Sequence, residues 1–138
     1  MSRDRESELW LKGDIHELGK LADWISPFAD AAGLNLALEE LFVNAVRHGG
    51  CEGLEQAVHI CVREIQGGFE VEFRDRGRPF DFTAAPAADL KAPLAERQGS
   101  GLGIHLVRQL MREITWRREG EWNILNMRYI VIEGEEVA

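Results

Sequence analysis

The spacing of the apolar residues changes at residue 58, and this change limits the possible folds more than any other feature of the sequence. Six apolar residues alternate with other residues over the next sixteen positions: Val58, Ile60, Val62, Phe69, Val71 and Phe73. This period of two is typical of strands with one buried face. The pair Gly67-Gly68 lies between the two runs and is a strong signal for a two-residue hairpin turn. The sequence therefore predicts an antiparallel hairpin whose apolar face other elements must cover.

Upstream of this hairpin, the apolar residues recur at helical spacing. Asp14 is expected to cap a first helix, and Glu17 three residues later would complete a capping box. Pro27 interrupts the helical pattern, and Gly33 is expected to end a second helical piece. A further helix is predicted to start at Asn35. Its apolar face is formed by Leu38, Leu41, Phe42, Ala45 and Val46.

The remaining elements complete an α+β domain. A short strand is expected over residues 8–13, a helix over 103–112, and two strands around 114–118 and 122–132 that turn near Gly120. Residues 76–98 are rich in Ala and Pro and indicate a loop with little regular structure. The order of elements predicts helices that cover one face of a mainly antiparallel sheet.

Length and composition limit the class of protein. The 138 residues, 45% of them hydrophobic and 29% charged, suit one folded domain, and residues 1–7 are expected to be flexible. A net charge of −8 argues against binding to nucleic acid or to an anionic membrane. No apolar run approaches the roughly 20 residues that cross a bilayer, and no signal peptide is recognised. A cytoplasmic domain is expected.

Three segments carry residues suited to ligand chemistry, and the first is a polar stripe. Glu40, Asn44 and His48 are spaced four residues apart, so they share one side of a helix. A solvated helix face is the ordinary explanation of such a stripe. Asparagine is a poor interior helix residue, however, and its amide is better used to hold a ligand or a metal.

The second and third segments both contain glycine. DRGRPFD at residues 75–81 places a carboxylate at a strand end, beside a glycine that lets backbone approach a ligand. GSGLG at residues 99–103 opens a helix, where free backbone amides and the helix dipole favour an anion. A dinucleotide-binding motif would need a strand directly before these glycines, and the Ala- and Pro-rich loop stands there instead.

In this order, ELFVNAVRHG (40–49), DRGRPFD (75–81) and GSGLGIHLV (99–107) resemble the three ATP-binding boxes of the GHKL superfamily. The chain is most similar to the small anti-sigma-factor serine/threonine-protein kinases, and the similarity covers nearly all of it. The resemblance implies a single histidine-kinase-like domain over residues 1–138, with the two-layer Bergerat sandwich of a mainly antiparallel sheet and helices on one face. It also implies ATP and Mg²⁺ as cofactors.

The resemblance also implies a role for each matching residue. Glu40 would be the catalytic base, and Asn44 would bind Mg²⁺ and the nucleotide phosphates. Asp75 would bind the adenine amino group, and residues 78–98 would form the ATP lid. The other nucleotide contacts would come from Gly77, Gly99, Gly101, Leu102 and Gly103. Phosphoryl transfer needs positioning and charge neutralisation more than covalent chemistry, and these residue types supply both.

The implied activity is phosphorylation of a small anti-anti-sigma (STAS-type) protein by a homodimer, with a sigma factor as a second candidate partner. Pro27 and the short segment 33–38 depart from the family pattern on the partner-binding side. Two alternatives stay open. One is an ATP-binding regulatory module without phosphoryl transfer. The other, the catalytic domain of a two-component histidine kinase, would require this chain to be a fragment.

Two histidines and two cysteines also suggest a metal site. His48, Cys51, His59 and Cys61 follow no known zinc spacing, however. The favoured interpretation of His59 and Cys61 is the exposed face of a strand.

Overall fold

The computed structural model describes residues 6–28, 30–84 and 99–131. Its centre is one five-stranded sheet with the strand order β1-β2-β3-β5-β4. Every neighbouring pair in this sheet is antiparallel. The strands are β1 (Glu6–Leu11), β2 (Val58–Ile65), β3 (Gly68–Asp75), β4 (Arg112–Glu119) and β5 (Trp122–Ile130).

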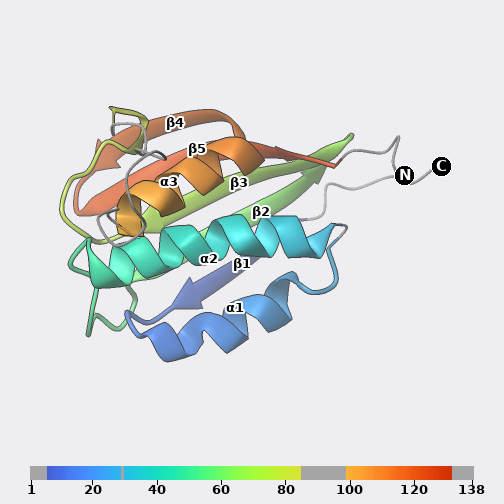
Figure 1. Cartoon of the computed structure of the whole chain (residues 1–138). Helices are drawn as coiled ribbons and strands as arrows, with labels where there is room; N and C mark the ends of the chain where they lie inside the picture. The colour runs from blue at the N-terminus through green and yellow to red at the C-terminus, as the bar shows by residue number, and fades with distance from the viewer. Residues whose placement is uncertain (1–5, 29, 85–98, 132–138) are drawn as a thin grey trace.

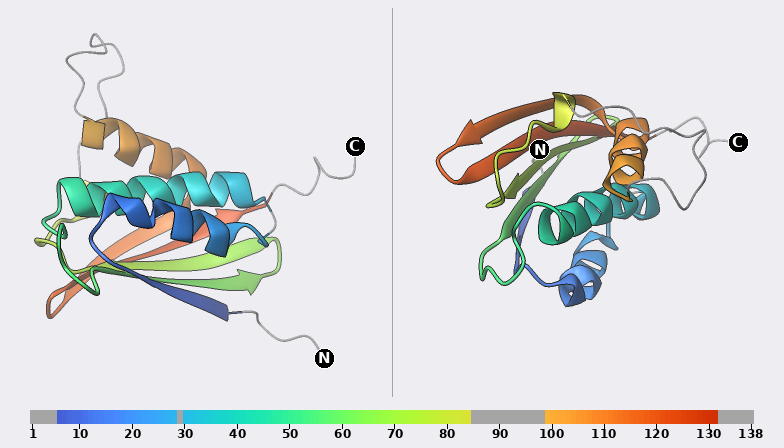
Figure 2. Two further views of the ribbon diagram at one scale, coloured as in Figure 1. Left: turned by 90° about the horizontal axis from the view of Figure 1, so that it is seen from below. Right: turned by 60° about the vertical axis from the view of Figure 1, so that its left-hand side comes forward.

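Helices form a second layer on one face of this sheet (Figure 1). They are α1 (Leu18–Ile25), α2 (Ala31–Arg47) and α3 (Gly99–Leu110), with short 3-10 turns η1 (Ile15–Glu17) and η2 (Phe82–Ala84). The two further views show the helices on one side and the strands on the other, with α2 between α1 and α3 (Figure 2). The predicted α+β sandwich with helices on one face is confirmed.

The core lies between these two layers. Apolar residues from both sides of it are completely or almost completely buried, among them Leu21, Leu38, Phe42, Ile60, Val71 and Phe73. The alternation predicted for the hairpin holds, because Val58, Ile60 and Val62 face the helices while their neighbours in β2 face outward. The two-residue turn is Gln66-Gly67, one residue earlier than predicted, because Gly68 pairs with Ile65 as the first residue of β3. Gly67 adopts a φ of +84° in this turn, a conformation that glycine tolerates better than other residues.

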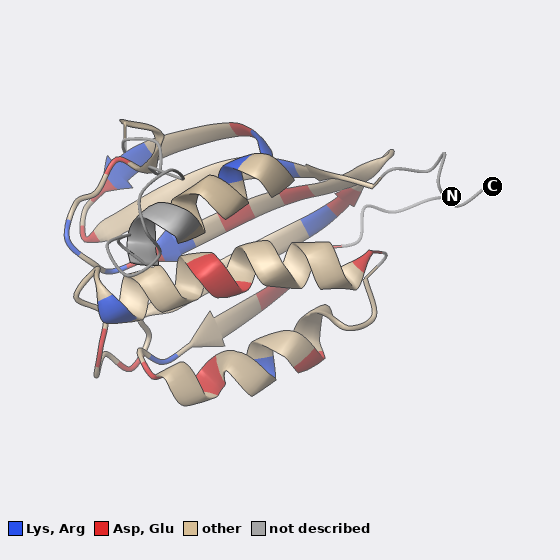
Figure 3. Cartoon of the chain, in the orientation of Figure 1, with Lys and Arg blue, Asp and Glu red and all other residues tan. Residues whose placement is uncertain are grey.

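The outer face of the sheet is polar. Acidic and basic residues are interspersed along the strands (Figure 3), and many of them form ion pairs between strands. Glu70 contacts Arg63 of β2 and Arg128 of β5, and Glu72 contacts Arg117 of β4 as well as Arg74 of its own strand. Within the described residues, no helix is long and apolar enough to span a membrane.

The expectation that Gly33 ends a helix and that Asn35 starts the next one is wrong. Helix α2 begins at Ala31 and runs through Gly33. A Cβ atom at Gly33 would lie 2.0 Å from the hydroxyl oxygen of Tyr129 in β5. Gly33 is therefore a packing position, where the absence of a side chain lets Tyr129 reach the helix. The Tyr129 hydroxyl donates a hydrogen bond of 2.7 Å to Asp30, the residue that precedes α2.

The capping box predicted at Asp14 is also wrong in detail. The Asp14 carboxylate accepts a hydrogen bond of 2.9 Å from the backbone amide of His16, so it caps η1 rather than α1. Glu17 does not reach back to Asp14, since its carboxylate accepts from the backbone amide of Lys12 at 2.9 Å. The short 3-10 turn changes the chain direction before the helix, which moves Glu17 away from the capping position.

The remaining boundaries differ by a few residues. Helix α3 starts at Gly99, four residues earlier than predicted, so the glycine segment lies inside its first turns. Strand β1 includes Glu6 and Ser7, while the rest of the predicted flexible segment lies outside the described residues. Of the predicted lid, residues 85–98 lie outside the described part of the chain, and Phe82–Ala84 form η2.

Candidate functional site

A cavity of about 230 Å³ lies between the helices and one end of the sheet. Five residues with polar or charged side chains line it, among apolar ones. They are Asn44, His48, Asp75, Arg78 and Asn123, and the apolar lining includes Leu41, Phe73, Phe82, Ile104, Trp116 and Leu125. A few convergent polar groups in an apolar pocket are typical of a small-molecule site.

Asp75 is the acidic residue of this cavity, and it is the last residue of β3. Its Oδ1 accepts hydrogen bonds from the backbone amide of Gly77 at 2.8 Å and from the side-chain amide of Asn123 at 3.0 Å. Burial raises the pKa of the Asp75 carboxyl, while these two hydrogen bonds oppose the rise. Because both bonds in the described structure use Oδ1, the other oxygen is the one that can accept from a ligand.

Asn123 holds the Asp75 carboxylate from the neighbouring strand. It is 4% exposed, and among the residues that the structure describes it is the one with a polar side chain in the buried class. Besides its bond to Asp75, its amide donates to the carbonyl of Arg78 at 2.8 Å. Its carbonyl accepts from the Trp116 indole and from the backbone amide of Phe80, each at 3.1 Å. All the hydrogen-bonding capacity of this buried amide is thereby used.

Sequence reasoning missed Asn123. The signal was present, because Asn123 shares the parity of Leu125, Met127 and Tyr129, which all face the core in β5. A polar side chain in an inward position needs partners. Those partners come from β3, β4 and the segment after β3, and their position depends on strand order and register.

Gly77 joins the end of β3 to the end of α2. A Cβ atom at Gly77 would lie 2.5 Å from the carbonyl oxygen of Gly49, so only glycine fits between these two segments. The next residue, Arg78, donates its backbone amide to the same carbonyl at 2.8 Å. The Arg78 guanidinium also donates to the carbonyl of His48. These contacts fix the floor of the cavity beside Asp75.

The polar stripe of α2 meets α3 at Gly103. Glu40 and Asn44 are both half-buried, whereas His48 is exposed. A Cβ atom at Gly103 would lie 2.7 Å from Oε1 of Glu40 and 3.3 Å from Nδ2 of Asn44. The structure thus brings together the first and third of the predicted segments. A carboxylate and an amide lie here against the N-terminal half of a helix.

A comparison with protein families assigns this fold. The profile of the histidine kinase-like ATPase domain matches residues 16–129. The chain belongs to this family. The resemblance to the GHKL superfamily that the three segments indicated is therefore confirmed, and membership implies ATP binding.

Two individual proteins are similar to this histidine kinase-like ATPase domain. The serine/threonine-protein kinase BtrW of Bordetella bronchiseptica is 29% identical over 94 residues, which cover 68% of this chain and 66% of the relative. The crystal structure of the RsbU and RsbW domains of Rv1364c from Mycobacterium tuberculosis has a TM-score of 0.60 at 15% identity. That similarity covers 91% of this chain and 32% of the other, and it supports the fold.

The residues of this ATPase domain suit a nucleotide with Mg²⁺. The Asn44 amide oxygen is a hard oxygen donor, which Mg²⁺ prefers, and the Glu40 carboxylate lies beside the same glycine, Gly103. Gly103 has no side chain to crowd these two groups, since a Cβ atom there would lie 2.7 Å from Oε1 of Glu40. Gly99, Gly101 and Leu102 form the first turn of α3, and the backbone amides of such a turn favour phosphate. The roles of the individual residues remain predictions.

Proposed function

We propose that this chain is an ATP-dependent serine/threonine-protein kinase that phosphorylates a small STAS-type partner and acts as an anti-sigma factor. Membership of the ATPase family supports the nucleotide part of this proposal. The similarity to a serine/threonine-protein kinase over 66% of that relative's length supports the transfer. One structural observation carries the proposal. Glu40 and Asn44 lie together at the N-terminal half of α3, beside the cavity that contains Asp75.

In this proposal the cavity binds the adenine ring of ATP. The Asp75 carboxylate accepts from the exocyclic amine, and the apolar walls cover the faces of the ring. The first turn of α3 receives the phosphates at its backbone amides. Asn44 holds Mg²⁺ through its amide oxygen, and the ion neutralises phosphate charge when bound.

Glu40 is the proposed general base. It accepts the proton of the partner's serine or threonine hydroxyl while the hydroxyl oxygen attacks the γ-phosphorus of ATP. The bond between this phosphorus and the bridging oxygen of ADP breaks, and ADP leaves with the bonding electrons. Binding of ATP needs no base, so the carboxylate at Glu40 favours a kinase over a module that only binds nucleotide.

The test compares Glu40→Gln with the parent in two measurements. Glu40→Gln keeps the size and polarity of the side chain but cannot take the proton. Transfer of labelled γ-phosphate to a partner captured from the host should fall by about 10²–10⁴-fold, the usual contribution of a general base. Calorimetric affinity for ATP should change little, because the base acts on the attacking hydroxyl.

The neighbouring glutamate offers a matched control. Glu39 accepts a hydrogen bond of 3.1 Å from Asn35, so it is engaged away from Gly103. Glu39→Gln should therefore leave both measurements unchanged. Asn44→Ala should weaken Mg²⁺-dependent ATP binding as well as transfer. If the parent binds ATP but labels no captured partner, the chain is an ATP-binding regulatory module instead.

A further inference from the structure

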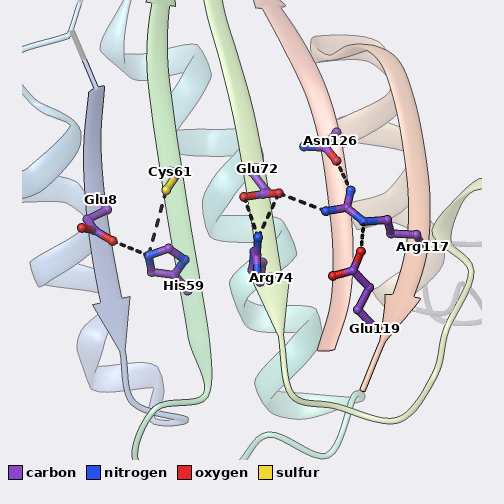
Figure 4. Close-up of polar contacts among 8 residues, drawn as sticks. All are labelled: Glu8, His59, Cys61, Glu72, Arg74, Arg117, Glu119 and Asn126. Carbon is purple, nitrogen blue, oxygen red and sulfur yellow. Dashed lines mark hydrogen bonds and ion pairs between the residues drawn. The ribbon is translucent and has the colours of Figure 1, made fainter. Parts of the chain in front are cut away.

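The outer face of the sheet carries a cluster of three residues with metal-binding side chains, on the opposite side from the helices. They are Glu8 in β1 and His59 and Cys61 in β2 (Figure 4). Glu8 is the direct cross-strand partner of Cys61 in the antiparallel register. His59 and Cys61 are two positions apart on one strand, so they point to the same face. The register therefore assembles a set of donors that no local motif shows.

The donor atoms of this cluster are close to one another. Nε2 of His59 lies 2.7 Å from Oε1 of Glu8 and 4.0 Å from Sγ of Cys61. All three donor atoms lie within 4.8 Å of each other. Zinc bonds are about 2.0–2.3 Å long, so the ligand atoms of a tetrahedral site lie about 3.3–3.8 Å apart. Small side-chain rotations would bring the three atoms to those separations.

The burial of the cluster suits a site with one fixed and one adaptable ligand. The His59 side chain is only 12% exposed, and its ring packs against Trp10 at a tilt of 37° with the ring centroids 4.2 Å apart. Packing therefore holds the imidazole in place. Glu8 is 64% exposed, so its carboxylate can move to complete the coordination. An ion pair between Glu8 and His59 accounts for their contact, but it gives Cys61 no role.

The charges around Cys61 favour a cation. Cys61 lies between Glu8 on β1 and Glu72 on β3 in the cross-strand register. The cross-strand partner of His59 on β3 is Arg74, whose guanidinium is paired with Glu72 at 3.2 Å. A divalent ion bound by a thiolate, a carboxylate and a neutral imidazole gives a site without net charge. The thiol proton passes to the solvent as the metal–sulfur bond forms.

We propose that Glu8, His59 and Cys61 bind a zinc ion between β1 and β2, with a water molecule in the fourth position. Imidazole and thiolate donors favour zinc over Mg²⁺ or Ca²⁺, which prefer oxygen ligands. This site lies on the face of the sheet away from the nucleotide cavity, and it does not depend on the proposed kinase activity. Zinc would link the edge strand β1 to β2, the strand with which it pairs.

The experiment titrates the untagged, nucleotide-free protein with Zn²⁺ by calorimetry and with Co²⁺ by absorption spectroscopy. The parent should bind one equivalent of either ion, and Co²⁺ should give a sulfur-to-metal charge-transfer band. Cys61→Ser should abolish this band, and it and Glu8→Gln should each weaken Zn²⁺ binding at least about 10- to 100-fold, since loss of an outer-shell partner alone has such effects. The other cysteine, Cys51, is completely buried and is still present in Cys61→Ser. Loss of the band in that variant would therefore assign the band to Cys61.

His16→Ala tests for adventitious binding. His16 is exposed and lies 2.9 Å from Asp14, which makes this pair the plausible nonspecific site. The variant should bind Zn²⁺ like the parent. The proposal is overturned if the parent binds neither ion, if either Cys61→Ser or Glu8→Gln binds Zn²⁺ as the parent does, or if His16→Ala removes binding. The Glu8 side chain is exposed, so Glu8→Gln should fold like the parent, and a loss of Zn²⁺ binding in this variant would not come from unfolding.

Discussion

The side-chain amide of Asn123 donates a hydrogen bond of 3.0 Å to the Asp75 carboxylate, although the two residues are 48 positions apart in the chain. They are also direct cross-strand partners in the register of β3 and β5. Asn123 further binds Arg78, Phe80 and Trp116, which surround the same cavity. The orientation of the acidic group in the candidate site is therefore set by the neighbouring strand.

Asp75→Asn should separate ligand binding from folding. The asparagine oxygen can still accept from Gly77 and Asn123, but an amide NH₂ replaces the second carboxylate oxygen, which these two bonds leave unused. A donor would then meet the amine of adenine. We expect ATP affinity to fall by about 1.5–3 kcal/mol, or about 10- to 150-fold, in calorimetry. Asp23→Asn, at an exposed position of α1, is the control. Unchanged affinity in Asp75→Asn would remove this residue from the adenine site.

The difference in stability between Asp75→Asn and the parent should depend on pH. Burial raises the pKa of Asp75 in the folded state above the ordinary value of 3.8. The folded state thus binds the proton more tightly, and ionised Asp75 destabilises the fold at neutral pH. This cost decreases as the pH falls through the raised pKa and vanishes below 3.8, where both states are protonated. The free energy of urea unfolding of Asp75→Asn, relative to the parent, should therefore be highest at neutral pH.

Asn123→Ala should destabilise the protein, because it leaves several buried groups without partners. The expected loss is at least about 1–3 kcal/mol, the cost of one unsatisfied buried polar group. Asn126→Ala is the matched control, since Asn126 lies in the same strand but on the outer face, where it accepts from Arg117 at 2.7 Å. That variant should stay within about 0.5 kcal/mol of the parent in urea unfolding. Equal losses in the two variants would contradict a special role for Asn123.

These residues show what the sequence could predict and what it could not. Local periodicity predicted the hairpin around Gly67, the apolar face of α2 and the strand pair that turns near Gly120, because each pattern repeats within one element. The three glycine-rich or polar segments indicated the family for the same reason. Each of them is contiguous in the chain.

The failures share one cause, which is contact between distant segments. Gly33 has the local properties of a helix stop, yet it lies inside α2 because Tyr129 packs there. From the sequence alone Asn123 is an ordinary strand residue, and the register of β3 and β5 is what pairs it with Asp75. Glu8 joins His59 and Cys61 only through the pairing of β1 with β2. Local patterns in the sequence do not show which residues of two strands pair with each other.

Gly103→Ala should impair transfer without unfolding the protein. The added Cβ would lie 2.7 Å from Oε1 of Glu40, and the end of this flexible side chain must move away. If Glu40 is the base, displacement by about 1 Å can reduce labelled-phosphate transfer by up to about 10²-fold. Stability to urea should stay the same or increase, because alanine favours the helix by about 0.5–1 kcal/mol over glycine. Transfer at the parental rate would argue against the proposed role of Glu40.

Gly33→Ala should destabilise the protein, although alanine is the better helix former. Its Cβ would lie 2.0 Å from the Tyr129 hydroxyl, which is held by its hydrogen bond to Asp30. Overpacking of this kind typically costs about 1–3 kcal/mol, which urea unfolding can measure. Gly19→Ala in α1 is the matched control, since no atom outside the adjacent residues and the helix's own backbone lies within 4 Å of the Cβ it would add. The control should gain about 0.5–1 kcal/mol from helix propensity.

A second variant tests whether the Tyr129 hydroxyl is the cause of this cost. Tyr129→Phe removes the hydroxyl oxygen and its bond to Asp30, so it should lose about 1.5–3 kcal/mol by itself, as for hydrogen bonds to charged groups. In the double variant Gly33→Ala/Tyr129→Phe, the added methyl group meets a ring without its oxygen. The combined loss should then be smaller than the sum of the single losses by about 0.5–3 kcal/mol, the range measured for residues in contact. Additive losses would mean that Gly33 is required for some reason other than the approach of Tyr129, and a gain in Gly33→Ala equal to that of Gly19→Ala would mean that the helix has room for a side chain there.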